Sequence, residues 1–242
     1  QQFIPYASTA HGDRAELALL NPTGCPAPPK SASHASAKSR KGTKTVNAPV
    51  CGARVVISAY TAYGARVTLT RVTVGGARRV VLPLALVRGG IGVGDGIYAL
   101  SIQSSTPVVA ELAQYVGGGP GDAAGAGAHP GFEELGVAGA TQISGAGLTA
   151  RGGLAVRVFN PTSAPMVIRV QGLGSAGPYF GQSYQMAAGA SLSVAVPNPS
   201  GAAARAVAGV SVTCSGPCAG ITLMGAGGSS SSASPRWGAI LQ

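Results

Sequence analysis

The sequence predicts an all-β protein that consists of two tandem antiparallel β-sandwiches. Three observations predict this class: short segments alternate apolar and polar residues, glycine or proline recurs between them, and two groups of landmarks repeat along the chain. A period of two places the apolar side chains on one face of a strand, and no segment combines a 3.6-residue period with helix caps. Strands joined by turns therefore account for the pattern.

The composition agrees with this class and excludes several others. The 242 residues include 38 glycines and 17 prolines. Charged residues make up only 10% of the chain, less than half the share of roughly 25% in ordinary soluble domains. The chain lacks a Gly-x-y period, so it is not collagen-like. Its uncharged stretches are interrupted too often by Gly, Ser, Pro and Gln to form a transmembrane segment.

A first echo divides the chain into two copies. The segment Ala15–Thr23 reads Ala-Glu-Leu-Ala-Leu-Leu-Asn-Pro-Thr, and Leu154–Thr162 reads Leu-Ala-Val-Arg-Val-Phe-Asn-Pro-Thr. Asn21 thereby aligns with Asn160 at an offset of 139 residues. Each segment is predicted to be a strand that ends in an Asn-Pro turn.

A second echo locates an insertion. Ile97–Pro107 matches Val207–Pro217 at an offset of 110, so the first copy holds 29 more residues between the two landmarks. The stretch Cys25–Cys51 accounts for this surplus, because a short turn near Ser163–Pro165 takes its place in the second copy. Chance similarity between two sequences rich in Ala, Gly and Val is the alternative, but the landmarks recur in the same order.

Each copy suits a two-sheet sandwich. Without the insertion a copy has about 95 residues and about seven short strands, which is the size of an immunoglobulin-like domain. The Cys…Trp…Cys signature of true immunoglobulin domains is missing, because the one tryptophan is Trp237. The clearest alternating segments are Val67–Val74, Val80–Leu84, Leu192–Val196 and Val210–Thr213.

Composition shifts set the predicted domain boundaries. Residues 1–116 form the first module with its insertion at 25–51, and residues 132–225 form the second module. The Gly-rich stretch 117–131 is a flexible linker by composition. Residues 226–242 comprise another such linker and a terminal strand.

Four cysteines predict disulfides and an oxidising compartment. Cys25, Cys51, Cys214 and Cys218 form no Cys-x-x-Cys pair, and two of them lie near each end of the chain. Of the three possible connectivities we therefore expect Cys25 with Cys51 and Cys214 with Cys218, the second pair across a hairpin turn. Disulfides and a first residue other than Met favour a secreted protein whose signal peptide has been removed, located outside the cell or at its surface.

The insertion is strongly basic. It carries five cations and no acidic residue: Lys30, Lys38, Arg40, Lys41 and Lys44. Such a loop predicts contact with an anionic surface such as a polysaccharide. It contains no aromatic residue that could stack on bases, so nucleic acid is not expected as a partner. The alternative is a solvated loop that keeps a sparsely charged protein soluble.

The acidic residues offer no catalytic pattern. All seven are isolated except Glu133 and Glu134, whose side chains would point to opposite faces of a strand. Ser8, His11 and Asp13 lie close together but lack a nucleophile elbow. We therefore predict a protein that is not an enzyme, with no catalytic residues, no cofactor and no metal site.

An apolar strand follows the second Gly-rich linker. By the repeat, Phe132–Ala138 is the first strand of the second copy, so Pro235–Gln242 would open a third module that does not exist. An unpaired apolar strand promotes association, and we expect Trp237, Ile240 and Leu241, or otherwise Phe3 and Ile4, to insert into the sheet of a neighbouring copy. The alternative is that the tail folds back onto its own second sandwich.

Several of these residues also resemble a known group of proteins. Phe3 with Ser8-Thr9, the run Leu17–Pro22, and Ser104–Glu111 followed by Tyr115 are similar to a family of unknown-function modules on secreted bacterial surface proteins. The resemblance implies repeated β-sandwiches and no particular chemistry. The second copy departs from the pattern, because Ile221 stands at the position of Glu111 and Gly225 at that of Tyr115. The architecture is also similar to that of subunits of donor-strand-assembled extracellular filaments.

Taken together, these features predict a secreted structural subunit that assembles with copies of itself into a pilus-like filament or surface layer. Strand donation between subunits of this homopolymer is the expected mechanism. The alternative is a cell-surface adhesion or carbohydrate-binding protein. Tyr60, Tyr63, Tyr179, Phe180 and Tyr184 form the aromatic clusters available for binding sugars.

Overall fold

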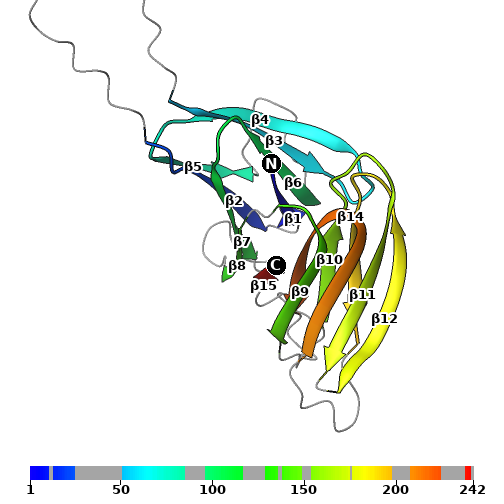
Figure 1. Ribbon diagram of the computed structural model, residues 1–242. Helices are drawn as coiled ribbons and strands as arrows, with labels where there is room; N and C mark the ends of the chain where they lie inside the picture. The colour runs from blue at the N-terminus through cyan, green and yellow to red at the C-terminus, as the bar shows by residue number, and fades with distance from the viewer. Residues whose placement is uncertain are drawn as a thin grey trace, which may run out of the picture.

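The computed structural model describes residues 1–10, 13–24, 51–84, 96–116, 129–135, 138–148, 154–174, 176–197, 208–224 and 238–240. These ranges contain antiparallel strands and no α-helix, which confirms the all-β prediction (Figure 1). No helix in them is therefore long and apolar enough to cross a membrane. The basic insertion between residues 25 and 50 lies outside the described ranges.

The first module is a sandwich of two four-stranded sheets. Sheet 1A has the strand order β1-β6-β3-β4, and sheet 1B has the order β5-β2-β7-β8. The strand bounds are β1 Gln2–Ser8, β2 Arg14–Asn21, β3 Ala53–Tyr60, β4 Arg66–Val74, β5 Arg78–Pro83, β6 Ile97–Ser104, β7 Val109–Val116 and β8 His129–Leu135.

The second module repeats this arrangement with one strand shared by both of its layers. Sheet 2A has the order β12-β11-β14-β9, and sheet 2B has the order β13-β10-β14-β15. The bounds are β9 Ala140–Leu148, β10 Leu154–Phe159, β11 Met166–Gly174, β12 Gly177–Met186, β13 Ser191–Val196, β14 Ala208–Met224 and β15 Gly238–Ile240.

Strand β14 passes from one layer to the other. Its first part, up to Cys214, pairs with β9 and β11, and its last part, from Ala219, pairs with β10 and β15. In the first module the same path is divided between two strands, β6 and β7. The two modules therefore have the same topology.

The strand registers support the internal repeat in sheets 1B and 2B. Leu17 lies opposite Leu112 in sheet 1B. Applying the sequence offsets of 139 and 110 to this pair gives Val156 opposite Thr222, which is the pair found in sheet 2B. The repeat is thus a structural repeat of strand pairs as well as a similarity of sequence.

The registers of the other two sheets locate the insertion. Val55 lies opposite Ser104 in sheet 1A, and Ile168 lies opposite Cys214 in sheet 2A, so β3 and β11 are offset by 113 residues. The offset for β2 and β10 is 139, and the two offsets differ by 26 residues. Nearly all of the surplus therefore lies between β2 and β3, where the Cys25–Cys51 stretch stands.

In the described residues the first module has eight strands, one more than the sequence pattern indicated, and the second has seven, of which β14 serves both layers. The predicted first strand of the second copy belongs to β8, which pairs with β7 and completes sheet 1B. Strand β15 pairs with β14 in the same way and completes sheet 2B. The strand after each Gly-rich linker thus completes the module before it, and no described strand is left over.

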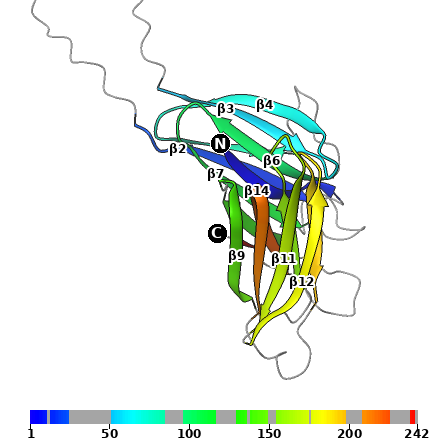
Figure 2. The ribbon, with the colours of Figure 1, turned by 45° about the vertical axis from the view of Figure 1, so that its right-hand side comes forward.

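Each sandwich has its own apolar core between its two sheets. Inward-facing residues fill the first core, and the largest fully buried ones are Ile4, Leu17, Leu19, Ile57, Leu100, Ile102 and Leu112. The second core is rich in valine, with Val156, Val158, Ile168, Val170, Val194, Val210 and Val212. The strands of the second module run across those of the first (Figure 2).

Candidate functional surfaces

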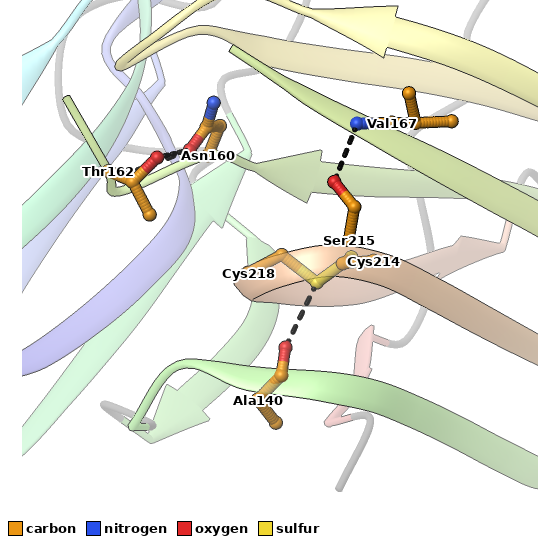
Figure 3. Close-up of a disulfide and its surroundings, with 7 residues drawn as sticks. All are labelled: Ala140, Asn160, Thr162, Val167, Cys214, Ser215 and Cys218. Carbon is orange, nitrogen blue, oxygen red and sulfur yellow. Dashed lines mark hydrogen bonds between the residues drawn. A yellow bond between two sulfur atoms is a disulfide. The ribbon is translucent and has the colours of Figure 1, made fainter. Parts of the chain in front are cut away.

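The predicted disulfide between Cys214 and Cys218 is present. Its S–S distance is 2.04 Å and its Cα atoms are 6.3 Å apart. The Cys218 sulfur also lies 3.2 Å from the carbonyl oxygen of Ala140 on β9 (Figure 3). Cys25 lies outside the described residues, so its pairing with Cys51 stays a prediction.

The disulfide stands at a different kind of turn from the one predicted. We expected it to close a hairpin, but both cysteines belong to β14, at the point where this strand leaves sheet 2A and enters sheet 2B. The pairing register with β9 shifts between Thr213 and Cys218. The covalent link therefore fastens the corner between two layers, for which the first module uses Ser104 and Val108 at the equivalent positions.

A serine recurs at the same corner in both modules. The backbone N–H of Arg54 donates to the Ser105 hydroxyl at 2.9 Å, and that of Val167 donates to the Ser215 hydroxyl at 3.0 Å (Figure 3). Each serine thus binds the beginning of β3 or β11. These contacts give the corner a structural role.

The Asn-Pro-Thr segments form a second recurring corner. Asn160 is fully buried and its Oδ1 accepts from the N–H of Thr162 at 3.0 Å, while its Nδ2 donates to the carbonyls of Ala164 and Ala187, both at 2.9 Å. Asn21 makes the corresponding contacts with Thr23 and with the carbonyl of Val74. The motif that revealed the repeat therefore holds the chain as it leaves β2 and β10.

The Ser8 and Asp13 side chains form a structural pair. The Ser8 hydroxyl donates to Asp13 Oδ2 at 2.6 Å, and Ser8 has almost no exposed surface. Gln114 on β7 binds the backbone of Ser8 through both its amide oxygen and its amide nitrogen, at 2.9 and 2.8 Å. A serine nucleophile requires a base and access to substrate, whereas this hydroxyl belongs to a buried residue whose backbone joins β1 to β7 through Gln114. His11 lies outside the described residues.

Four arginines lie at the end of the first module where the insertion begins and ends. Arg54 is the second residue of β3, and Arg71 lies diagonally from it on β4, on the outer face of sheet 1A. Arg78 and Arg79 open β5, opposite the last residues of β2. All four are exposed, and we call them the basic pole. The five cations of the insertion, Lys30, Lys38, Arg40, Lys41 and Lys44, lie outside the described residues.

One carboxylate lies near this pole. Arg79 Nη2 is 3.8 Å from Glu111 Oε2, and the two side chains are 61% and 36% exposed. An ion pair with this exposure is screened by water and contributes little to stability. Most of the charge at the pole is therefore available to an external anion.

The two modules are joined by a third apolar cluster. Phe159 on sheet 2B packs between Phe3 and Tyr60 on the outer face of sheet 1A, with ring centroids 5.9 and 5.0 Å away. Ala99 and Ala219 complete this buried cluster. The contact thus covers one outer face of each sandwich.

Close backbone contact reinforces the same interface. A Cβ atom at Gly64, in the β3–β4 turn, would lie 2.4 Å from the carbonyl oxygen of Ala188, and Gly64 has a φ of +91°. Gly189, with a φ of +68°, approaches Gly64 from the second module. A side chain at Gly64 would therefore force the modules apart as well as strain the backbone.

A cation lies at the edge of this interface. Arg157 is buried, its Cζ is 5.5 Å from the centroid of the Tyr6 ring, and its Nη1 donates to the Ser193 hydroxyl at 3.2 Å. Burial raises the pKa of the Tyr6 hydroxyl, and the nearby Asp13 carboxylate raises that pKa further, against the lowering effects of Ser8 and Arg157. Tyr6 therefore stays neutral between the modules.

The residues predicted to donate strands occupy sheets of their own chain. Phe3 and Ile4 are buried in β1, which pairs with β6. The backbone of Ile240 pairs with that of Ile221 in β14. Trp237 and Leu241 lie outside the described residues. This arrangement corresponds to the alternative in which the tail folds back onto its own second sandwich.

No group of three or more His, Cys, Asp or Glu side chains that could hold a metal ion occurs in the part of the chain that the structure describes. Comparison with protein families, with curated proteins and with solved structures found no match. The function is therefore inferred from the surfaces of the molecule.

Proposed function

We propose that the protein is a non-catalytic structural subunit that acts outside the cytoplasm and assembles with copies of itself. The observation that carries this proposal is an apolar strip on the outer face of sheet 1B. Leu20 and Val109 lie directly opposite each other on β2 and β7, Val81 lies on the neighbouring strand β5, and all three are exposed. Exposed apolar side chains that gather in this way favour a binding surface.

Two further features support the proposal. The Cys214–Cys218 disulfide favours an oxidising compartment, because reducing compartments keep thiols reduced. The buried cluster around Phe159 holds the modules as one body, which suits a subunit that transmits a regular arrangement to its neighbours. Strand donation, the route expected from the sequence, would require β15 to leave β14 and reach another copy.

Sedimentation velocity over a range of protein concentrations tests the proposal, with negative-stain microscopy of the same samples. We expect the sedimentation coefficient to rise with concentration and regular fibres or layers to appear. A protein that remains monomeric up to the highest soluble concentration, with the disulfide intact, would overturn the proposal.

Contact with an anionic polysaccharide is a second candidate function. The observation that favours it is the basic pole, in which Arg54, Arg71, Arg78 and Arg79 surround the strand ends that flank the insertion. The nine cations of the pole and the insertion are more than half of the 17 in the chain. A concentration of one sign of charge attracts polyanions and makes their binding sensitive to salt.

The insertion can be removed to test this function. Replacing Ala27–Pro49 with a short Gly/Ser turn should leave the sandwich folded, because the second module joins the equivalent strands through Pro161–Pro165. The shortened protein, and an Arg54→Ser/Arg71→Ser variant, should elute from a sulfated-polysaccharide column at lower salt. Arg169→Ser, which removes an exposed arginine from the second module, is the matched control. Unchanged elution of both variants would exclude the basic surface as the binding site.

A further inference from the structure

The contact between the modules joins two unlike faces. The outer face of sheet 1A contributes Phe3 and Tyr60, and the outer face of sheet 2B contributes Phe159. By the strand registers, sheet 1A corresponds to sheet 2A, and sheet 1B corresponds to sheet 2B. We call the outer faces of sheets 1A and 2A the A-type faces, and those of sheets 1B and 2B the B-type faces. The contact between the modules therefore uses one A-type face, on sheet 1A, and one B-type face, on sheet 2B. Among the described residues, one face of each type is left over, on sheets 2A and 1B.

The free B-type face keeps the apolar character of the one in use. Leu20 opposite Val109 in sheet 1B corresponds to Phe159 opposite Ala219 in sheet 2B. Phe159 and Ala219 are 0% and 1% exposed, whereas Leu20 and Val109 are 39% and 44% exposed. Val81 beside them is also 44% exposed. The same positions are thus covered in one module and open in the other.

The free A-type face has the corresponding positions with smaller side chains. Tyr60 opposite Ala99 in sheet 1A corresponds to Leu173 opposite Gly209 in sheet 2A. Phe3 opposite Ser101 likewise corresponds to Ser144 opposite Ser211. The outer face of sheet 2A thus has Leu, Gly and Ser at the positions where sheet 1A contacts Phe159 with aromatic rings. These smaller side chains leave room for aliphatic side chains of a partner.

We propose that copies of this chain join by repeating, between molecules, the packing that joins the modules within one molecule. The outer face of sheet 1B of one copy, with Leu20, Val81 and Val109, packs on the outer face of sheet 2A of the next, with Ser144 and Leu173. This inference rests on the proposed function, self-assembly, and names the surfaces that carry it out.

The charges on the two faces do not oppose the contact. Arg14, Glu16, Arg79 and Glu111 lie on the outer face of sheet 1B and balance one another, and Arg169 is exposed on the outer face of sheet 2A. The contact therefore does not bring like net charges together.

The geometry of the contact determines the kind of assembly. Because the two faces differ, a copy that has bound one neighbour still has one free face, and an open chain of copies ends in one free B-type face and one free A-type face. Such heterologous contacts generate either rings or open helical filaments. The internal contact already fixes the rotation from one module to the next, and the same rotation applied between copies gives a chain of modules with one repeating step.

Three single variants test the inference. Leu20→Arg places a charge in the B-type face, and Ser144→Arg places one in the A-type face at the position equivalent to Phe3. Ile97→Arg is the matched control, because Ile97 is 40% exposed, compared with 39% for Leu20, and lies on neither face. Sedimentation velocity and negative-stain microscopy follow assembly, and circular dichroism verifies that each variant is folded.

We expect Leu20→Arg and Ser144→Arg each to abolish assembly, and Ile97→Arg to assemble like the unaltered protein. An equimolar mixture of the two defective variants should form dimers and nothing larger, because each supplies the intact face that the other lacks. Assembly that survives both face variants would overturn the inference and leave the proposed function standing. Loss of assembly only on truncation at Ser234 would likewise overturn it, and would assign assembly to exchange of β15. An unaltered protein that never assembles would overturn both proposals.

Discussion

At each of the two Asn-Pro corners, a single asparagine side chain makes hydrogen bonds that the backbone cannot make by itself. The proline after each asparagine has no N–H and so cannot donate a backbone hydrogen bond at the corner. The Asn160 amide donates to the carbonyls of Ala164 and Ala187. Ala164 lies in the loop between β10 and β11, and Ala187 directly follows β12. Buried polar groups of the backbone need such partners. The corner is therefore sensitive to the chemistry of this one side chain.

Asn160→Ala should lower the free energy of unfolding by about 1–3 kcal/mol, the usual result of leaving buried polar groups without partners. Asn160→Asp should also destabilise the protein, because a carboxylate cannot donate to the two carbonyls. Urea denaturation followed by circular dichroism measures both effects. Ser163→Ala, at an exposed position two residues before Pro165, should change little. Equal stability of Asn160→Ala and Ser163→Ala would show that the corner does not depend on the amide.

The buried Tyr6 hydroxyl makes stability depend on alkaline pH. Its pKa is raised in the folded protein, mainly by burial, so the unfolded chain loses this proton first, near pH 10. The stabilisation from neutral Tyr6 is complete below that pH and is lost as pH rises through the folded pKa. The midpoint of thermal unfolding should therefore fall above about pH 10, and Tyr6→Phe should reduce the fall. An identical pH profile in the variant would rule out Tyr6 as the responsible group.

At the level of strands, the sequence predicted which segments form strands better than it predicted which strands pair with each other. Alternation correctly placed strands in Val67–Val74, Val80–Leu84, Leu192–Val196 and Val210–Thr213. The two echoes located the insertion between β2 and β3. The apolar segment after the Gly-rich linker was also recognised as a strand, but was assigned to the wrong module. Alternation records which face of a strand is buried, whereas the partner of a strand depends on tertiary packing that alternation does not encode.

The corner in β14 was misassigned for a related reason. Gly216 and Pro217 between the two cysteines are typical of a hairpin turn, yet the strand continues through them into the other sheet. A hairpin keeps both arms in one sheet, whereas this corner moves the chain across the core. The spacing of cysteines alone cannot distinguish these geometries, because both bring the two Cβ atoms together.

The first module shows that this corner can form without a disulfide. Ser104 and Val108 stand at the positions of Cys214 and Cys218. Cys214→Ser/Cys218→Val should therefore fold to the same structure and lose about 2 kcal/mol of stability, the chain-entropy effect of a loop this short. Guanidinium denaturation with and without reductant measures the loss. A variant that cannot fold would show that the corner in the second module requires its covalent link.

At the scale of the whole molecule, the internal repeat could have predicted the contact between the modules, which alternation alone did not reveal. Leu20 and Phe159 occupy equivalent, outward-facing positions, and an outward phenylalanine in a strand is unusual unless something covers it. Comparing the outward positions of the two copies would have identified Phe159 as an interface residue. It would not have identified Tyr60 or Phe3 as its partners, because the mutual orientation of two sandwiches depends on their surfaces as a whole. The basic pole escaped prediction likewise, since its arginines are spread over three strands.

This equivalence supplies a matched pair of variants for the coupling between modules. Phe159→Ala removes a fully buried ring that touches both Phe3 and Tyr60, and should cost about 3 kcal/mol or more. Leu20→Ala shortens the equivalent exposed side chain and should stay within about 0.5 kcal/mol of the unaltered protein. Scanning calorimetry on dilute samples should show one unfolding transition for the unaltered protein and for Leu20→Ala. Phe159→Ala should show two, because each sandwich keeps its own core when the contact between them is weakened. A single transition in Phe159→Ala, displaced no further than that of Leu20→Ala, would mean that the cluster does not couple the modules.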